Sequence, residues 1–175
     1  MRDNKRALAL LGLAGAVCCG ALSYGEASSG KKITMQTTSQ TAMKRANGTT
    51  DASGVMYFPQ QETAAAFKDS VMLYDGVPEK NYRVAVYHRD KGGEVEIHKK
   101  DTDVFYILEG SATFVTGGTI TGGKETAVDE VRVATMEGGV ARKVGKGDVI
   151  IVPANVTHWY KEVQQPITYF GVKVR

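Results

Sequence analysis

From residue 71 onward, apolar and polar positions alternate in short runs, which is the pattern of β-strands that bury one face. The runs are rich in β-branched and aromatic residues, and glycine pairs such as Gly92-Gly93 separate them. Short strands divided by glycine turns indicate a β-sandwich or β-barrel, not alternating strands and helices. We therefore predict strands over residues 71–75, 82–89, 94–98, 104–118, 130–137, 148–153 and 167–174.

The first residues have a different pattern. Basic residues precede an apolar run over 7–17, and small residues follow it, which is the order of a secretory signal peptide. Gly25 and Ala27 suit the positions before a cleavage site, so we expect a signal peptide over 1–27 and a secreted or periplasmic protein. The run is shorter than the ~20 apolar residues that span a membrane.

The only cysteines, Cys18 and Cys19, lie inside this segment. Cleavage after Ala27 leaves a mature chain with no disulfide and no nucleophilic thiol. Two alternatives stay open: an uncleaved N-terminal anchor, and lipidation of one of the two cysteines.

Between the signal and the strands, the chain changes character twice. Residues 28–50 are rich in Ser, Thr, Gln and Lys, which predicts a flexible tether. A short helix is predicted at 59–69, where Pro59 stands near the start and alanines favour helix. One folded domain is expected over 51–175.

Composition narrows the classes of partner. Hydrophobic residues make up 42% and charged residues 23% of the chain, and the net charge of +3 is spread along it. The chain has no block of Lys and Arg residues. Binding to nucleic acid, or to a membrane after signal cleavage, is therefore not expected. A barrel of about one hundred residues without disulfides has exposed sheet edges and a limited core, so we expect a homodimer.

A cluster of polar residues lies within the strand pattern. Glu96 and His98 share one strand face, and after a turn Asp103 begins the next strand, in a chain with three histidines. If the two strands pair, these side chains converge on one point. Carboxylate and imidazole groups are oxygen and nitrogen donors for a divalent transition metal.

A second segment with similar chemistry reads GKGDVIIVPANVTHWYKE, residues 145–162. Together the two segments resemble the cupin family, whose motifs are G-x5-H-x-H-x(3,4)-E-x6-G and G-x5-P-x-G-x2-H-x3-N. The resemblance covers about residues 70–175. It implies an all-β fold, the cupin double-stranded β-helix or jelly-roll barrel, here with a short N-terminal helix. It also implies that two chains pair as a homodimer, as barrels of this kind commonly do.

In the first motif, Glu96 stands at the first histidine, His98 at the second, Asp103 at the glutamate and Gly110 at the closing glycine. The two acidic replacements make the resemblance more specific for fold than for chemistry.

In the second motif, Gly147, Pro153 and His158 match. Asn155 replaces a glycine, and Glu162 stands where the motif has asparagine.

The motif positions predict a metal site of His98, His158 and Asp103, with Glu96 as a further ligand, a neighbour of a ligand or a general base. Two histidines and one carboxylate suit iron(II). Two carboxylates favour iron or manganese, neutralise a divalent ion and weaken its attraction for anionic substrates. Copper and zinc are the alternatives. In isolation, each histidine would be a solvated strand residue or a core residue bonded to backbone.

Three further residues are candidates for the pocket wall. Phe105 and Trp159 are core residues that could also contact substrate, and His88 lines or flanks the barrel.

The function expected from these residues is an exported, metal-dependent enzyme for a small molecule, carbohydrate-like or aromatic, with oxidative chemistry first among the options. The alternative is a non-catalytic secreted module that binds a small molecule or sugar, with a structural metal or none. Gly122-Gly123-Lys124 lacks the rest of a phosphate-binding loop.

Overall fold

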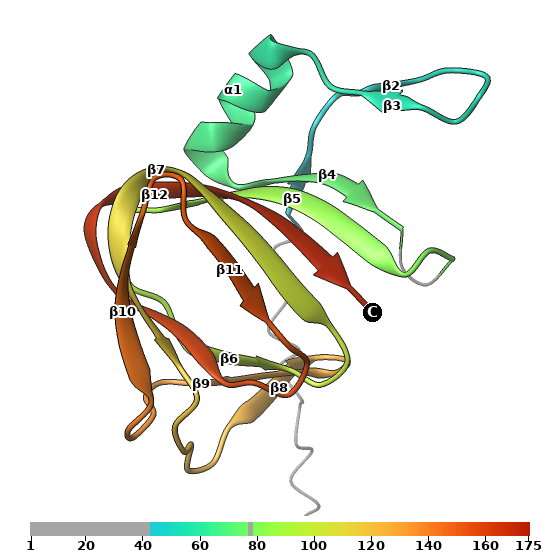
Figure 1. Ribbon diagram of the computed structural model, residues 1–175. Helices are drawn as coiled ribbons and strands as arrows, with labels where there is room; N and C mark the ends of the chain where they lie inside the picture. Colours follow the sequence, from blue (N-terminus) through green and yellow to red (C-terminus); the bar gives the residue numbers. More distant parts are fainter. Residues whose placement is uncertain (1–42, 77–78) are drawn as a thin grey trace, which may run out of the picture. The chain divides into compact units, whose positions relative to one another are not determined.

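Alternating buried and exposed side chains produce the dominant element, a 10-stranded sheet that curls on itself (Figure 1). The computed structural model describes residues 43–76 and 79–175, so the predicted signal peptide and most of the predicted tether lie outside the described residues. In the described part, no helix has the length and apolar character needed to cross a membrane. The strands are β1 (Lys44–Arg45), β2 (Thr49–Thr50), β3 (Met56–Tyr57), β4 (Val71–Asp75), β5 (Tyr82–Arg89), β6 (Val95–His98), β7 (Thr102–Thr116), β8 (Lys124–Ala127), β9 (Glu130–Val133), β10 (Val140–Gly145), β11 (Val149–Val152) and β12 (His158–Val174).

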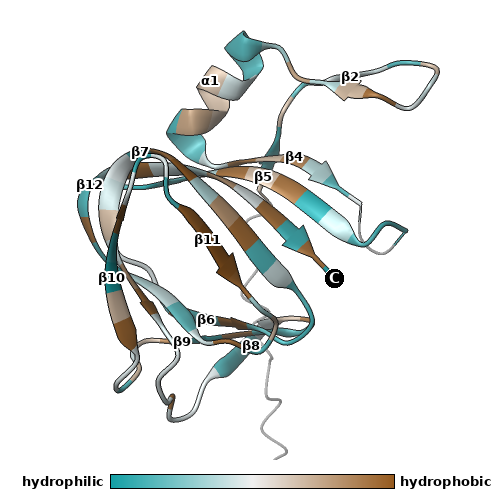
Figure 2. Ribbon diagram, in the orientation of Figure 1, coloured by the Kyte–Doolittle hydropathy of each residue, from teal (hydrophilic) through white to brown (hydrophobic). Residues whose placement is uncertain are grey.

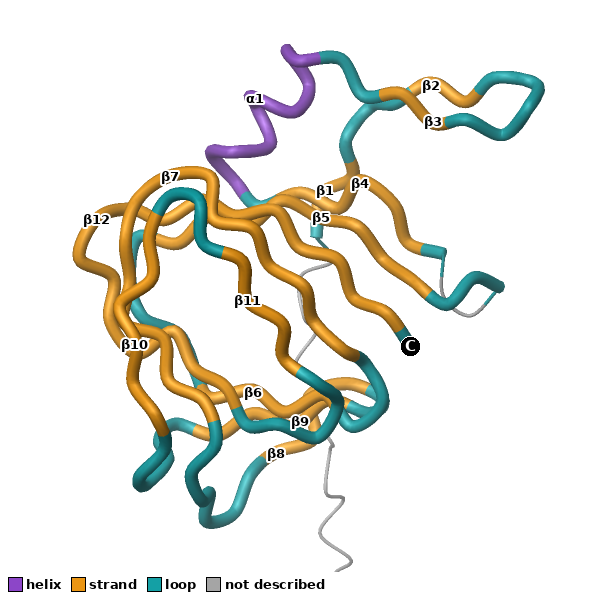
Figure 3. The backbone as a smooth tube through the Cα atoms, viewed as in Figure 1, coloured by secondary structure: helices purple, strands orange, loops and turns teal. Residues whose placement is uncertain are grey.

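Two long antiparallel strands, β7 and β12, form the spine of the barrel. β12 also pairs with β5 on its other side and meets β6 at one position, while β7 also pairs with β10 and β11. β6, β9 and β8 lie across the barrel from β4 and β5 (Figures 1 and 3). The predicted all-β jelly-roll fold with one short helix is confirmed.

The inner face of this sheet carries the hydrophobic core. Brown and teal positions alternate along the strands in Figure 2, as expected for strands that bury one face. The core cluster consists of Phe105, Ile107, Ala112, Phe114, Val144, Val152, Tyr160, Ile167 and Tyr169.

Outside the barrel, α1 (Gln60–Asp69) covers a smaller apolar cluster. Its one buried residue, Ala66, packs with Val71 and Val86 of the sheet. The helix begins directly after Pro59, so the predicted helix at 59–69 is confirmed almost to the residue.

Gly110 changes the phase of β7. Asp103, Phe105 and Ile107 are buried before it, whereas Ala112 and Phe114 are buried after it, so the inward positions shift from odd to even. Gly110 has φ of 80°, and a Cβ atom there would overlap the carbonyl oxygen of Pro166 on β12. Only glycine combines this backbone angle with so close an approach.

Some elements differ from the sequence prediction. β8, β10 and the first half of β12 were not expected, because their outward positions are polar and β12 contains register shifts. The segment expected to be a tether contains β1 and β2 in its described part, and β1 pairs in parallel with β4.

Candidate metal centre

β6 and β12 bring the predicted ligands together. β6 presents Glu96 and His98 on its inner face, and His158 of β12 is paired directly with Glu96. Asp103 arrives from β7, which pairs with β12 but not with β6 among the described strands. The sequence expectation that the two segments of the first motif are neighbouring strands is therefore not met. The side chains converge across the barrel interior.

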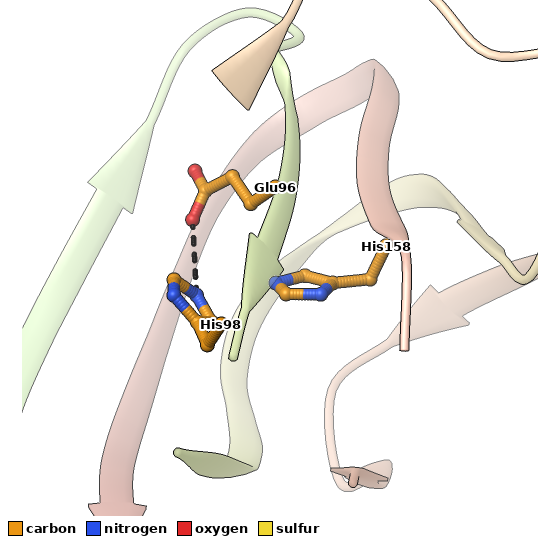
Figure 4. Close-up of side chains that lie close together, drawn as sticks. All are labelled: Glu96, His98 and His158. Carbon is orange, nitrogen blue, oxygen red and sulfur yellow. Dashed lines mark ion pairs between the residues drawn. The ribbon is translucent and has the colours of Figure 1, made fainter. Parts of the chain in front are cut away.

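The ligand atoms are close together. Glu96, His98 and His158 point toward one another in Figure 4, and one ligand atom from each lies within 4.8 Å of the others. Asp103 Oδ2 lies 3.2 Å from His98 Nε2 and 3.4 Å from His158 Nε2. His98 Nε2 is also 3.5 Å from Glu96 Oε2.

Each histidine has an oxygen atom near its other ring nitrogen. Nδ1 of His158 donates a hydrogen bond of 3.0 Å to the carbonyl of Val156, so Nε2 carries the free lone pair toward Asp103. Nδ1 of His98 lies 3.7 Å from a carboxylate oxygen of Glu130. A carbonyl or carboxylate behind the imidazole is the usual support of a metal-binding histidine.

The two acidic ligands share an arrangement. Oε1 of Glu96 lies 2.9 Å from Arg132 Nη1 and 3.4 Å from Arg89 Nη2, which leaves Oε2 facing His98. Oδ1 of Asp103 lies 2.9 Å from Lys173 Nζ, while Oδ2 faces both histidines. Each carboxylate therefore has one oxygen held by a base and one directed into the cluster.

These neighbours set the pKa values. Burial alone would raise the pKa of Glu96 and of Asp103, but His98 and nearby cations hold both pKa values below the usual range. Burial also opposes charge on His98, yet Asp103 and Glu96 raise its pKa to about 9. Burial lowers the pKa of His158, which keeps this imidazole neutral and able to bind a cation.

The cluster fits a divalent ion. His98, Asp103 and His158 are 4%, 1% and 4% exposed. Within the described residues, His98 Nε2 and Asp103 Oδ2 are buried without a hydrogen-bond partner. Buried polar atoms are normally satisfied, and a cation between these two atoms would satisfy both.

The cluster opens into a cavity of about 220 Å³. Phe105 lines it, together with Tyr87, Tyr160 and Tyr169. Tyr169 stacks between the other two tyrosines, with ring centroids 5.0 and 4.9 Å apart. The wall beside the polar cluster is therefore flat and aromatic.

Two residues predicted to contact substrate do not line this cavity. His88 bonds instead to Thr168 and Asp90, and the Trp159 indole donates a 2.6 Å hydrogen bond to the carbonyl of Gly93. Alternation explains both positions, since His88 lies between inward Tyr87 and Arg89, and Trp159 follows inward His158.

The sequence analysis missed the basic residues around the carboxylates. Arg132 is the pairing partner of Glu96 across β6 and β9, and Lys173 is the partner of Asp103 across β7 and β12. Strand register places them, and no local motif marks them.

Comparison with known proteins supports these motifs. The family model described as Cupin matches residues 80–174. The chain belongs to the cupin family. Among curated proteins, this cupin is 33% identical over 111 residues to acireductone dioxygenase of Leptospira biflexa serovar Patoc. The match covers 62% of this chain and 50% of the relative, so the chain spans half of that protein's length.

Similar folds occur among solved structures. The cupin domain of Schizosaccharomyces pombe Cnp3 is 16% identical, with a TM-score of 0.43, and the match covers 61% of this cupin and 59% of that chain. A putative ethanolamine utilization protein Q from Salmonella typhimurium is 11% identical, with a TM-score of 0.49, and the match covers 75% and 96%.

Glu96→Gln is expected to lower metal affinity more than ~100-fold, because it removes a ligand charge and leaves Arg89 and Arg132 uncompensated beside the ion. Isothermal titration of Mn(II) into the metal-free protein measures this change. Glu94→Gln, on the same face of the cavity, is the matched control and should change affinity less than ~3-fold. Equal affinities for both variants would place Glu96 outside the metal's ligands.

Proposed function

We propose that this cupin is a metal-dependent enzyme that carries out oxidative chemistry on a small molecule. His98, His158 and Asp103 hold the ion, and Glu96 is the fourth ligand. The observation that carries the proposal is the convergence of two imidazole Nε2 atoms and two carboxylates at one end of a cavity. The partly dioxygenase-like sequence supports the oxidative class.

A bound iron(II) or manganese(II) ion would supply a redox-active centre with positions left for substrate and oxygen. The protein's own groups position and shield it. Val156 orients the imidazole of His158, and Glu130 lies 3.7 Å behind the imidazole of His98. Lys173 holds Asp103 with one oxygen toward both imidazoles. Phe105 and the tyrosine stack exclude water from the aromatic side of the cavity.

The role of Glu96 follows from its surroundings. Its pKa lies well below the usual range because His98 and two arginines oppose the effect of burial. A carboxylate this acidic is a weak base at neutral pH. A ligand role for Glu96 is therefore favoured over the general-base role that the sequence left open.

Two measurements test the proposal. Metal analysis of the purified protein should find about one iron or manganese ion per chain, and an oxygen electrode should record consumption with at least one of a panel of enediols, hydroxy acids, sugars and phenols. Metal without oxygen consumption by any substrate would overturn the oxidative class.

One observation favours a second candidate, a binding module without metal. Glu96, Glu130 and Asp103 each already have a basic partner, so none of these carboxylates needs an ion as its counter-charge. Protein that binds no divalent ion under any loading condition would support this candidate over the enzyme.

Export and dimerisation are also proposed. Intact mass of protein recovered outside the cytoplasm should correspond to a start near Ser28, and light scattering at micromolar concentration should give the mass of two chains. Full-length protein in the cytoplasm, or the mass of one chain, would contradict the respective proposal.

A further inference from the structure

Basic side chains beside the candidate metal ligands change the charge that a substrate meets. Three carboxylates surround the histidines, and each lies within ion-pair distance of a base. Arg132 contacts Glu96 at 2.9 Å and Glu130 at 2.8 Å. Lys173 contacts Asp103 at 2.9 Å, and Arg89 is a second cation beside Glu96. These carboxylates are therefore already neutralised before any metal binds.

The whole cavity shows the same balance. Arg83 and Glu94 also line it, so acidic and basic side chains are equal in number, four of each. With neutral imidazoles, their charges cancel, and a divalent ion adds two positive charges. The sequence alone led to the opposite expectation, that two carboxylates neutralise the ion and weaken its attraction for anions. Arg89, Arg132 and Lys173 were absent from that account.

Two buried donors at the cavity are available to a ligand oxygen. Within the described residues, the Tyr160 hydroxyl is buried without a hydrogen-bond partner. The Lys173 ammonium contacts Asp103 Oδ1 at 2.9 Å, which leaves N–H groups of this ammonium for a second acceptor. Both residues line the cavity, and the Tyr160 ring stacks on the Tyr169 ring and lies 5.1 Å from the Arg89 guanidinium. A buried donor without an acceptor is costly, and an oxygen atom of a ligand would satisfy it.

We propose that the cavity takes a small organic acid, bound as its carboxylate, whose oxygens accept hydrogen bonds from Tyr160 and Lys173. The inference rests on the metal of the proposed function, because the ion supplies the uncompensated charge. The cavity of about 220 Å³ has room for a ligand of a few carbon atoms. An acid with one or two negative charges offsets the charge of the ion.

The test compares acids with neutral molecules of nearly the same shape. Isothermal titration into Mn(II)-loaded protein uses glyoxylate, pyruvate, 2-oxobutyrate and benzoylformate, each beside its methyl ester. At least one acid should bind more than ~10-fold tighter than its ester, and the preference should disappear in metal-free protein. If Mn(II) does not bind when it is titrated into the metal-free protein, the proposed function fails. If it binds but no acid is preferred, the substrate inference alone fails.

Lys173→Gln is expected to change the affinities for Mn(II) and for the acid in opposite directions. Removing this cation should strengthen Mn(II) binding about 10-fold, because Asp103 loses a competing partner, and should weaken acid binding about 10-fold. Lys143→Gln removes the same charge from an exposed position of β10 and should leave both affinities within ~2-fold. Unchanged affinities in Lys173→Gln would overturn the inference.

If Lys173→Gln lowers both affinities because the fold is disturbed, Tyr160→Phe tests the inference independently. It keeps the aromatic stack and removes only the hydroxyl. Acid binding should weaken about 5-fold or more, with Mn(II) affinity unchanged. Acid affinity equal to that of the wild-type protein would show that the hydroxyl takes no part.

Discussion

Alanine in place of His98 or His158 is expected to abolish stoichiometric metal binding, with affinity for Mn(II) lowered by more than ~1000-fold. Each change removes a buried, oriented imidazole, and the remaining carboxylates are already held by basic side chains on their second oxygens. No other imidazole among the described residues joins the cluster, because His88 bonds to Thr168 and Asp90 on the other face of β5. Metal analysis after loading and dialysis measures the loss.

His88→Ala is the control for the metal experiment. It removes a histidine that lies on the other face of β5 and bonds to Thr168 and Asp90 instead of the proposed ligands. Metal content should therefore stay at the wild-type level. Thermal unfolding of all three metal-free variants separates loss of a ligand from loss of the fold. Metal retained at full occupancy in both His98→Ala and His158→Ala would reduce the cluster to a set of buried ion pairs and favour the binding module.

Gly110→Ala is expected to have the largest effect on stability, lowering the free energy of unfolding by about 3–5 kcal/mol or preventing folding. A Cβ atom at this position meets the backbone of Pro166 and Ile167, which cannot move without shifting β12. The φ angle of 80° adds the cost of a left-handed conformation. Urea denaturation followed by circular dichroism gives the change.

Gly117→Ala isolates the contribution of the backbone angle. Gly117 has a similar φ of 74°, but a Cβ atom there meets no atom within 4 Å. Its substitution should cost about 1–2 kcal/mol, the left-handed penalty alone. If the two variants are equally stable, β12 adjusts freely to the extra atom, and the motif glycine serves only the backbone angle.

Local signals carried much of the fold prediction. The helix was predicted because Pro59 and an alanine run mark its start and body within a few residues. β4 and β5 have regular apolar patterns and agree with their predicted ranges. The first half of β12 has the polar run from Lys161 to Pro166 and pairs through register shifts, so no periodic pattern reveals it.

The site divides in the same way. Motif spacing and strand parity were enough to predict that His98, Asp103 and His158 lie close together. Parity alone could have excluded Trp159 from the cavity wall. The charges that face the carboxylates depend on which strands pair and in what register. Lys173 lies 70 positions after Asp103 in sequence and beside it in the sheet. Long-range pairing of this kind has no local signature in a single sequence.

The position of β12 determines when the metal can be bound. This strand pairs with β5, β6 and β7 and supplies His158, yet it is synthesised after all three. Until it docks, the emerging chain has neither its central sheet pairing nor a complete ligand set, and long-range strand pairing is slow. A complete set of candidate ligands therefore exists only after β12 has docked, so folding of the last strand precedes binding of an ion by all four groups.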